Sequence, residues 1–194
     1  MDVSRRPCKT MPTIFSHAIL STALGAAYAT EPMPKRFWFL AAMCSVLPDF
    51  DVLAFNLGIP YRSVWGHRGF THSALFAVLA GCVIAWTAFR QEELVTMKRS
   101  RISLAIFFSV AMMSHLALDS LTNGGLGVAA LWPVETARYF APWRPIRVSP
   151  IGADFFSAYG MMVLVDEIIW IWLPAVTLVA VAKLFHRIVR SKTN

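Results

Sequence analysis

The hydrophobic positions of this chain fall into long stretches that are separated by polar segments. Each stretch approaches or reaches the roughly 20 residues that an α-helix needs to cross a bilayer. Pro48 interrupts the second stretch and Pro174 interrupts the last one. The stretches are residues 14–30, 37–57, 72–89, 102–121 and 158–182. This pattern predicts an all-α, polytopic membrane helix bundle of about five transmembrane helices, which forms a single domain over residues 1–194.

The polar segments between these stretches predict the connections of the bundle. Residues 1–12 form an N-terminal tail, and residues 183–194 form a basic tail after the last helix. Thr71 is placed to cap the helix that we expect at residues 72–89. The longest connection, residues 123–157, is rich in proline, tryptophan and arginine. Such a composition indicates an ordered interfacial segment that lies over the bundle.

The composition also points to a membrane protein. Hydrophobic residues make up 57% of the chain and charged residues 15%, whereas soluble domains contain about 25% charged residues. The net charge is +7, but the basic residues cluster between the apolar stretches, so we expect no nucleic-acid partner. Cys8, Cys44 and Cys82 show no metal-finger spacing and predict no disulfide framework. His17 inside the first stretch favours a retained helix over a cleaved signal peptide.

Two histidines stand just before the third apolar stretch. His67 and His72 lie five residues apart, and Gly66 and Gly69 beside them permit a tight backbone and close approach of a ligand. Arg68 between the histidines could bind a phosphate or hold a carboxylate. This spacing favours a metal-binding pair over two unrelated histidines.

Further metal-ligating residue types occur at the ends of other stretches. His115 and Asp119 share one helix face, and Asp49 and Asp51 follow a proline. Taken alone, the first pair could be a simple hydrogen-bonded pair and the second a capped helix end. Ionisable groups inside a membrane helix cost about 2.5–3.5 kcal/mol and usually persist by pairing, binding ions or lining a cavity. The apolar surroundings therefore favour a functional role.

The order of the helices brings these residues to one side of the membrane. If the helices alternate across the bilayer, His17, the two aspartates, the histidine pair, the His115–Asp119 pair and Glu167 all fall at one depth. Taken alone, His17 could be an interfacial histidine, and Asp166 is chemically as suitable as Glu167. We therefore expect a single site. The distribution of lysine and arginine gives a slight preference for its lying on the outer, periplasmic side.

Imidazoles and carboxylates in these numbers suit two or three divalent ions, with Zn²⁺ favoured and Mn²⁺ as the alternative. The predicted metal ligands are His17, Asp49, Asp51, His67, His72, His115, Asp119 and Glu167. The predicted catalytic residues are Asp49, Glu167 and Arg68. A substrate phosphate is expected to contact Arg138, Arg144 and Arg147, for which anchoring at the membrane interface is the alternative.

Four short motifs carry a resemblance to a known family. They are His17, Leu47-Pro48-Asp49-Phe50-Asp51, His67-Arg68-Gly69-Phe70-Thr71-His72-Ser73 and His115-Leu116-Ala117-Leu118-Asp119. Together they resemble the YdjM family of inner-membrane metal-dependent hydrolases. Trp132-Pro133, the Pro145–Pro150 stretch and Glu167-Ile168-Ile169-Trp170 extend the likeness over most of the chain. The resemblance implies a hydrolase in the bacterial inner membrane.

The order of ligand types is also similar to that of zinc-dependent phospholipase C and nucleases of the P1 type, which are all-α phosphodiesterases with clustered zinc ions. That likeness implies ligands at His17, Asp51 or Asp49, His67 or His72, His115, Asp119 and Glu167. Those enzymes carry further histidines after the His-x-x-x-Asp pair, whereas no histidine lies between positions 115 and 186 here. This departure puts a third metal ion in doubt.

The sequence therefore predicts a membrane-bound metal-dependent hydrolase. We expect metal-activated water to cleave a phosphoester bond of a phospholipid or lipid-linked substrate. The expected partners are the lipid bilayer and this amphipathic substrate, with no obligate protein partner. Two alternatives stay open: a protein that binds or transports divalent metal without catalysis, and a structural membrane protein that a metal staples together.

Overall fold

Helices form nearly all of the regular structure that is described. The computed structural model describes residues 10–11, 13–150 and 155–193. Its elements are β1 (Thr10–Met11), α1 (Ile14–Tyr28), α2 (Lys35–Val46), the 3₁₀-helix η2 (Leu47–Val52), α3 (Leu53–Asn56), the 3₁₀-helix η3 (Phe70–His72), α4 (Ala74–Thr87), α5 (Gln91–Thr96), α6 (Arg101–Ser120), β2 (Ser149–Pro150), α7 (Ala158–Glu167), the π-helix η5 (Ile168–Trp172) and α8 (Leu173–Thr193). The prediction of a mostly helical chain is confirmed.

Hydroxyl side chains begin several of these helices. Thr13, Ser73, Ser100 and Ser157 each precede a helix and accept a hydrogen bond from a backbone N–H of its first turn. The expected cap at Thr71 is therefore wrong, because Ser73 caps α4. The hydroxyl of Thr71 is instead directed to Asp51.

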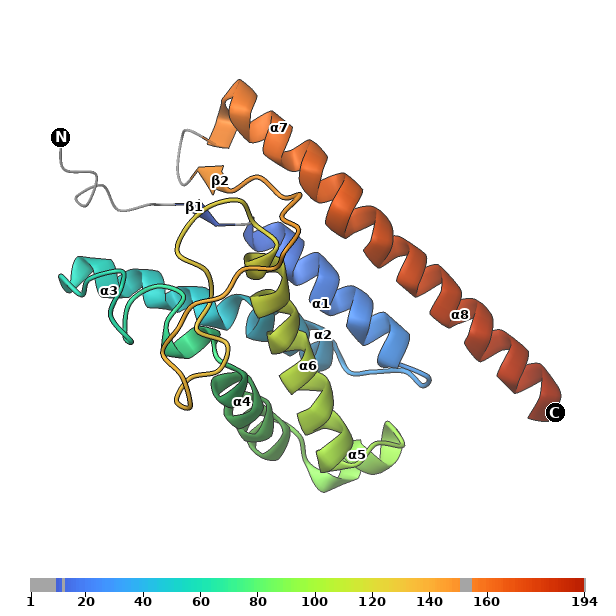
Figure 1. Ribbon diagram of the computed structural model, residues 1–194. Coiled ribbons are helices and arrows are strands. Elements are labelled where there is room, and N and C mark those ends of the chain that lie inside the picture. The colour runs from blue at the N-terminus through green and yellow to red at the C-terminus, as the bar shows by residue number, and fades with distance from the viewer. Residues whose placement is uncertain (1–9, 12, 151–154, 194) are drawn as a thin grey trace, which may run out of the picture.

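Helix α6 occupies the centre of the bundle, with α1, α2 and α4 packed around it (Figure 1). The packing against α4 is close because Gly81 has no side chain. A Cβ atom at Gly81 would lie 2.4 Å from Ser109 Oγ and 2.6 Å from its backbone nitrogen. Phe37, Phe108 and Met112 lie fully buried in the main hydrophobic core between α2, α4 and α6. This core fixes the direction in which the last turns of α6 point.

The long C-terminal helix lies beside α1 (Figure 1). The expected interruption at Pro174 is wrong, because α7, η5 and α8 run on as one helix from Ala158. Proline cannot donate a hydrogen bond and crowds the carbonyl four residues earlier. The π-helical turn η5, closed by the N–H of Leu173 on the carbonyl of Ile168, accommodates it. The predicted basic tail likewise continues α8 as far as Thr193.

Two of the described helices are long and apolar enough to cross a membrane: α6, and the continuous helix over residues 158–192. Helices α1 and α4 are apolar but shorter. The count of about five transmembrane helices therefore stays a prediction. The C-terminal helix exposes large apolar side chains such as Val176, Val181 and Leu184, as a lipid-facing helix would.

The second apolar stretch ends as a 3₁₀-helix, not as an α-helix. Pro48 stands at its beginning, and successive side chains of the 3₁₀-helix η2 point about 120° apart, because this helix has three residues per turn. Asp49 is buried with 8% of its surface exposed, whereas Phe50 is 51% exposed and Asp51 turns inward again. The break that the sequence predicts at Pro48 thus brings two carboxylates to the interior of the bundle.

The loop between α3 and η3 folds back tightly on itself. A Cβ atom at Gly66 would lie 2.3 Å from the carbonyl oxygen of Pro60, and one at Gly69 would lie 2.1 Å from that of Val64. Only glycine fits at either position. Arg68 between them has a positive φ of 61°. The two glycines therefore shape the turn that places His67 and Arg68 in the interior.

Candidate metal centre

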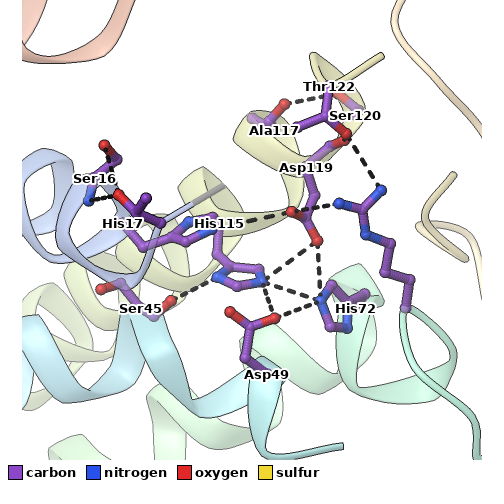
Figure 2. Close-up of polar contacts among 12 residues, drawn as sticks. Ser16, His17, Ser45, Asp49, His72, His115, Ala117, Asp119, Ser120 and Thr122 are labelled. Carbon is purple, nitrogen blue, oxygen red and sulfur yellow. Dashed lines mark hydrogen bonds and ion pairs between the residues drawn. The ribbon is translucent and has the colours of Figure 1, made fainter. Parts of the chain in front are cut away.

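Helix α6 and the 3₁₀-helices η2 and η3 bring four buried donor residues together. Helix α6 carries His115 and Asp119 on one face of its last turns, η2 carries Asp49, and η3 carries His72. Figure 2 shows the four side chains converging, and one ligand atom from each lies within 4.8 Å of the others. We call these residues the four-donor group. Their convergence follows the common depth that the order of the helices predicted.

The distances within the four-donor group are close to those between the ligands of a tetrahedral ion, and two of them are somewhat shorter. His72 Nε2 lies 3.1 Å from Asp119 Oδ2, 3.0 Å from His115 Nε2 and 3.6 Å from Asp49 Oδ1. His115 Nε2 lies 3.4 Å from Asp49 Oδ1 and 3.6 Å from Asp119 Oδ2. Zinc bonds of about 2.0–2.2 Å in a tetrahedron put neighbouring ligand atoms roughly 3.3–3.6 Å apart. The spacing of the four donor atoms therefore suits one small divalent ion.

Hydrogen bonds on the outer side of each imidazole set its orientation. His115 Nδ1 lies 2.6 Å from the carbonyl oxygen of Ser45, which can only accept. His115 therefore carries a proton on Nδ1, and Nε2 is the nitrogen that faces the group. His72 Nδ1 lies 3.1 Å from Asp51 Oδ2, which favours the same arrangement. Partners of this kind fix the tautomer and ring direction of metal-binding histidines.

Arg68 orients the carboxylate of Asp119. Its guanidinium donates to Asp119 Oδ1 at 3.1 Å, to Thr122 Oγ1 at 3.3 Å and to the carbonyl of Gly124 at 3.1 Å. Both Arg68 and Asp119 are fully buried, so the pair is shielded from water. The arginine thus leaves Oδ2 directed to the four-donor group. The structure uses Arg68 to hold a carboxylate, one of the two roles that the sequence left open.

Asp51 connects the histidine loop to the group. Its Oδ1 lies 2.6 Å from His67 Nδ1, and its Oδ2 accepts hydrogen bonds from Thr71 Oγ1 at 2.6 Å and from the backbone N–H of Arg68 at 3.0 Å. Burial alone would raise the pKa of Asp51, but hydrogen bonds with His67 and His72 outweigh it and hold this pKa below its ordinary value. Asp51 is therefore a carboxylate at neutral pH.

Asp51, His67 and His72 also lie close enough to form a second possible ligand set, the three-donor group. It shares His72 with the four-donor group. Ions on opposite nitrogens of one imidazole would lie farther apart than the 3.5–4 Å of two-metal phosphoesterases. The geometry accordingly favours Asp51 as the residue that orients His72. The number of ions stays a prediction.

Buried carboxylate oxygens of the four-donor group face imidazole nitrogens, at 3.1 Å for Asp119 Oδ2 and 3.4 Å for Asp49 Oδ1, without a hydrogen bond of good geometry. Within the described residues, both carboxylate oxygens of Asp49 and Oδ2 of Asp119 have no hydrogen-bond partner. Buried carboxylate oxygens are rarely left in that state, because each loses its hydration without compensation. A cation bound among these oxygens would remove that cost. The donor set of nitrogen and oxygen atoms therefore fits zinc, or manganese as the alternative.

His17 lies against the four-donor group without belonging to it. Its ring stacks on His115 with the ring centroids 3.9 Å apart, and its Nε2 lies 4.0 Å from Asp119 Oδ1. The residue is fully buried, and neither of its ring nitrogens has a hydrogen-bond partner among the described residues. His17 is thus placed to join the group by a small rotation or to support His115.

Glu167 is fully buried but lies in neither group. Its carboxylate accepts hydrogen bonds from the backbone N–H of Thr13 at 2.7 Å, from Thr13 Oγ1 at 2.5 Å and from Ser16 Oγ at 2.7 Å. Trp172 donates to the same serine hydroxyl at 2.8 Å. Glu167 therefore joins the C-terminal helix to the beginning of α1, one residue before His17. Its predicted role as a ligand or base stays untested.

The three arginines predicted to bind a phosphate contact other parts of the protein. Arg138 donates to the backbone carbonyls of Tyr61, Ser63 and His67, and so pins the histidine loop. Arg147 pairs with Asp166 at 3.2 Å. Arg144 lies over the ring of Phe140. Arg138 and Arg147 already bind other groups of the protein. In the structure they therefore hold the histidine loop and Asp166, respectively.

Sequence analysis missed the residues that hold the predicted ones. The backbone carbonyl of Ser45 orients His115. Every residue has such a carbonyl, so the residue type at position 45 could not predict this contact. Thr13 and Ser16, which hold Glu167, carry ordinary hydroxyl side chains that the sequence analysis did not single out. We expected Thr71 to cap a helix. Its position one residue before His72 could have indicated that both side chains contact the carboxylate of Asp51.

The family of the chain follows from comparison with known proteins. The model of the YdjM inner membrane protein family matches residues 11–192. The chain belongs to this family. It is also similar to the inner membrane protein YbcI of Escherichia coli (strain K12), with 37% identity over 169 residues that cover 87% of this chain and 95% of the relative. No solved structure matches it.

These comparisons agree with the apolar helices and place the protein in the bacterial inner membrane, as predicted. The face of the membrane on which the four-donor group lies stays a prediction.

Proposed function

We propose that the protein is a membrane-bound, metal-dependent hydrolase that cleaves a phosphoester bond of a phospholipid or lipid-linked substrate. The observation that carries this proposal is the four-donor group, in which two imidazoles and two carboxylates converge at the distances of a small divalent ion. Membership of an inner membrane protein family supports a lipid substrate, because an enzyme in the membrane has direct access to amphipathic molecules.

The residues of the group have distinct tasks in this proposal. A bound divalent ion would polarise a phosphoryl oxygen and lower the pKa of a water molecule. His72 and His115 would hold that ion through Nε2, and Asp119 through the oxygen that Arg68 leaves free. Asp49 is the most exposed of the four donors and has no hydrogen-bond partner among the described residues. It is therefore the group best placed to take up a proton from water.

A second candidate function is a metal-stapled structural protein. It is favoured by the closure of the group: four protein donors complete a tetrahedral site, whereas catalytic zinc sites keep one position for water. His72, His115 and Asp119 are also fully buried. In the hydrolase, Asp49 has to leave or share its position when substrate binds. In the structural protein, all four donors stay bound.

Hydrolysis of defined lipids tests the proposal. The protein is purified in detergent without chelator and supplied with Zn²⁺ or Mn²⁺. It is then mixed with phosphatidylglycerol, phosphatidylethanolamine or a polyprenyl diphosphate, and the products are measured by mass spectrometry. We expect the added metal to be required for cleavage of the phosphoester into an alcohol and a product that keeps the phosphate. His72→Ala should abolish this cleavage. His186→Ala, which changes a histidine of α8 away from the group, should leave the activity unchanged.

The variant Asp49→Asn separates the two candidates. A hydrolase that uses Asp49 for proton transfer should lose turnover while keeping much of its bound metal. A structural protein should show no turnover in any variant, and Asp49→Asn should lower only its stability. Absence of lipid hydrolysis in fully metal-loaded protein would reject the hydrolase and favour the staple.

A further inference from the structure

A pocket of about 340 Å³ lies beside the histidine loop, between η2, α3 and η3. Its lining is mostly apolar and includes Phe50, Leu57, Trp65 and Phe70. Trp65 and Phe70 pack together with ring centroids 5.3 Å apart and form one wall. Pockets of a few hundred Å³ with apolar walls and few polar groups are typical of small-ligand sites.

Two polar residues of the pocket lining contact His72, a member of the four-donor group. They are Asp51 and Thr71, and both contact Nδ1 of His72, at 3.1 Å each. The opposite nitrogen of His72 belongs to the four-donor group. Phe50, whose ring lines the pocket, directly follows Asp49, the most exposed of the four donors. One imidazole thus separates the apolar pocket from the candidate metal position.

We propose that this pocket binds an acyl chain of a membrane phospholipid, whose phosphate-bearing end then lies toward the four-donor group. The proposal rests on the proposed function in treating that phospholipid as the substrate. The apolar walls match a hydrocarbon chain. The polar end lined by Asp51 and Thr71, one imidazole away from the four-donor group, matches the junction between chain and head group of an amphipathic molecule.

The exposed apolar walls and the membrane setting of the family together favour a lipid occupant. Leu57 is 78% exposed and Trp65 is 62% exposed, so water or lipid covers them in the single chain. The chain belongs to an inner membrane family, and acyl chains are the apolar groups most abundant around such a protein. A second copy of this chain is the competing occupant, and the experiment below distinguishes the two.

A photoreactive lipid tests the proposal directly. The full-length protein in detergent is titrated with phosphatidylglycerol that carries a diazirine near the end of one acyl chain. After illumination, mass spectrometry of the peptides locates the label. We expect saturable labelling of segments 47–57 and 64–76, whereas labelling of the exposed C-terminal helix rises in proportion to the lipid. Labelling is measured with and without added Zn²⁺.

A matched pair of leucines supplies the control. Leu57 lines the pocket, whereas Leu53 on the neighbouring α3 is similarly exposed and does not line it. Leu57→Ser should weaken the saturable labelling about tenfold, because it removes apolar surface that an acyl chain would cover. Leu53→Ser should not change it. Both variants should keep the wild-type metal content, which shows that the fold is retained.

Three results would overturn the proposal. They are non-saturable labelling in the pocket, equal labelling in the two leucine variants, and dimers cross-linked through segments 47–57 and 64–76 that leave the pocket unlabelled. Saturable labelling without hydrolysis in metal-loaded protein would uphold acyl-chain binding and reject the hydrolase. Hydrolysis with an unlabelled pocket would uphold the hydrolase and reject acyl-chain binding in this pocket.

Discussion

The carboxylate of Glu167 accepts a hydrogen bond from the hydroxyl of Thr13 at 2.5 Å, although 154 residues separate them in the chain. The same carboxylate accepts hydrogen bonds from the backbone of Thr13 and from Ser16. These contacts fix the C-terminal helix against the start of α1 and so fix the place of His17. Glu167 accordingly supports the candidate metal centre from outside the two donor groups.

We expect Glu167→Gln to destabilise the protein by about 1–3 kcal/mol without changing its metal content. The amide of glutamine cannot accept all the hydrogen bonds that the carboxylate accepts, so buried donors lose their partner. Thermal unfolding in detergent, followed by circular dichroism, measures the loss.

Asp166→Asn is the matched control, because Asp166 is partly exposed and pairs with Arg147 at the surface. Such pairs contribute about 0–1 kcal/mol. If Glu167→Gln instead lost bound metal at unchanged stability, Glu167 would be the ligand that the sequence predicted.

The metal content of histidine variants distinguishes the two donor groups. We expect roughly one Zn²⁺ per chain in the wild type, because one group has four donors at tetrahedral distances. His72→Ala and His115→Ala should both lose it. His67→Ala should retain it, because His67 is not one of the four donors and its Nδ1 is directed to Asp51.

Inductively coupled plasma mass spectrometry of the purified proteins measures these contents, with His186→Ala as the histidine control. A wild type with about two ions, of which His67→Ala loses one, would show that the three-donor group holds its own ion. It would also contradict the orienting role assigned to Asp51.

Replacing Arg68 should weaken metal binding although Arg68 is not a ligand. Arg68 holds Asp119 Oδ1, and loss of such a supporting partner typically weakens metal affinity about 10–100-fold. We expect Arg68→Met to show this loss, and Arg68→Lys to show a smaller one, since lysine keeps the charge but not the planar fork.

Competition with a fluorescent zinc chelator measures the affinity of these variants. Arg62→Met changes an exposed arginine of the same loop and should leave the affinity unchanged. Equal affinities for Arg68→Met and Arg62→Met would show that Asp119 needs no such partner.

Chelation should lower the thermal stability of the protein. An ion that binds only the folded state at a thousandfold excess over its dissociation constant stabilises that state by about 4 kcal/mol. We expect the unfolding midpoint to fall on addition of a chelator and to return on addition of Zn²⁺. His72→Ala should unfold at the same temperature with and without chelator. An unchanged midpoint in the wild type would indicate that the buried residues form a hydrogen-bonded core without metal.

Much of the fold and of the centre could be predicted from local sequence. The apolar stretches ended within a few residues of α4 and α6, because hydrophobic periodicity and capping residues act locally. Pro48 marked the end of α2 for the same reason. Pro174 misled, because a proline normally ends a helix, and only the neighbouring π-helical turn removes the conflict.

The sequence by itself determined which residue types gather at one end of the bundle, because the order of helices in a membrane dictates the depth of each helix end. Only the tertiary structure decided which of them meet. Asp49 and Asp51 are two residues apart, yet one joins the four-donor group and the other orients His72. That choice depends on how η2, η3 and α6 pack, and packing directions to within an ångström are set by contacts between residues far apart in the chain.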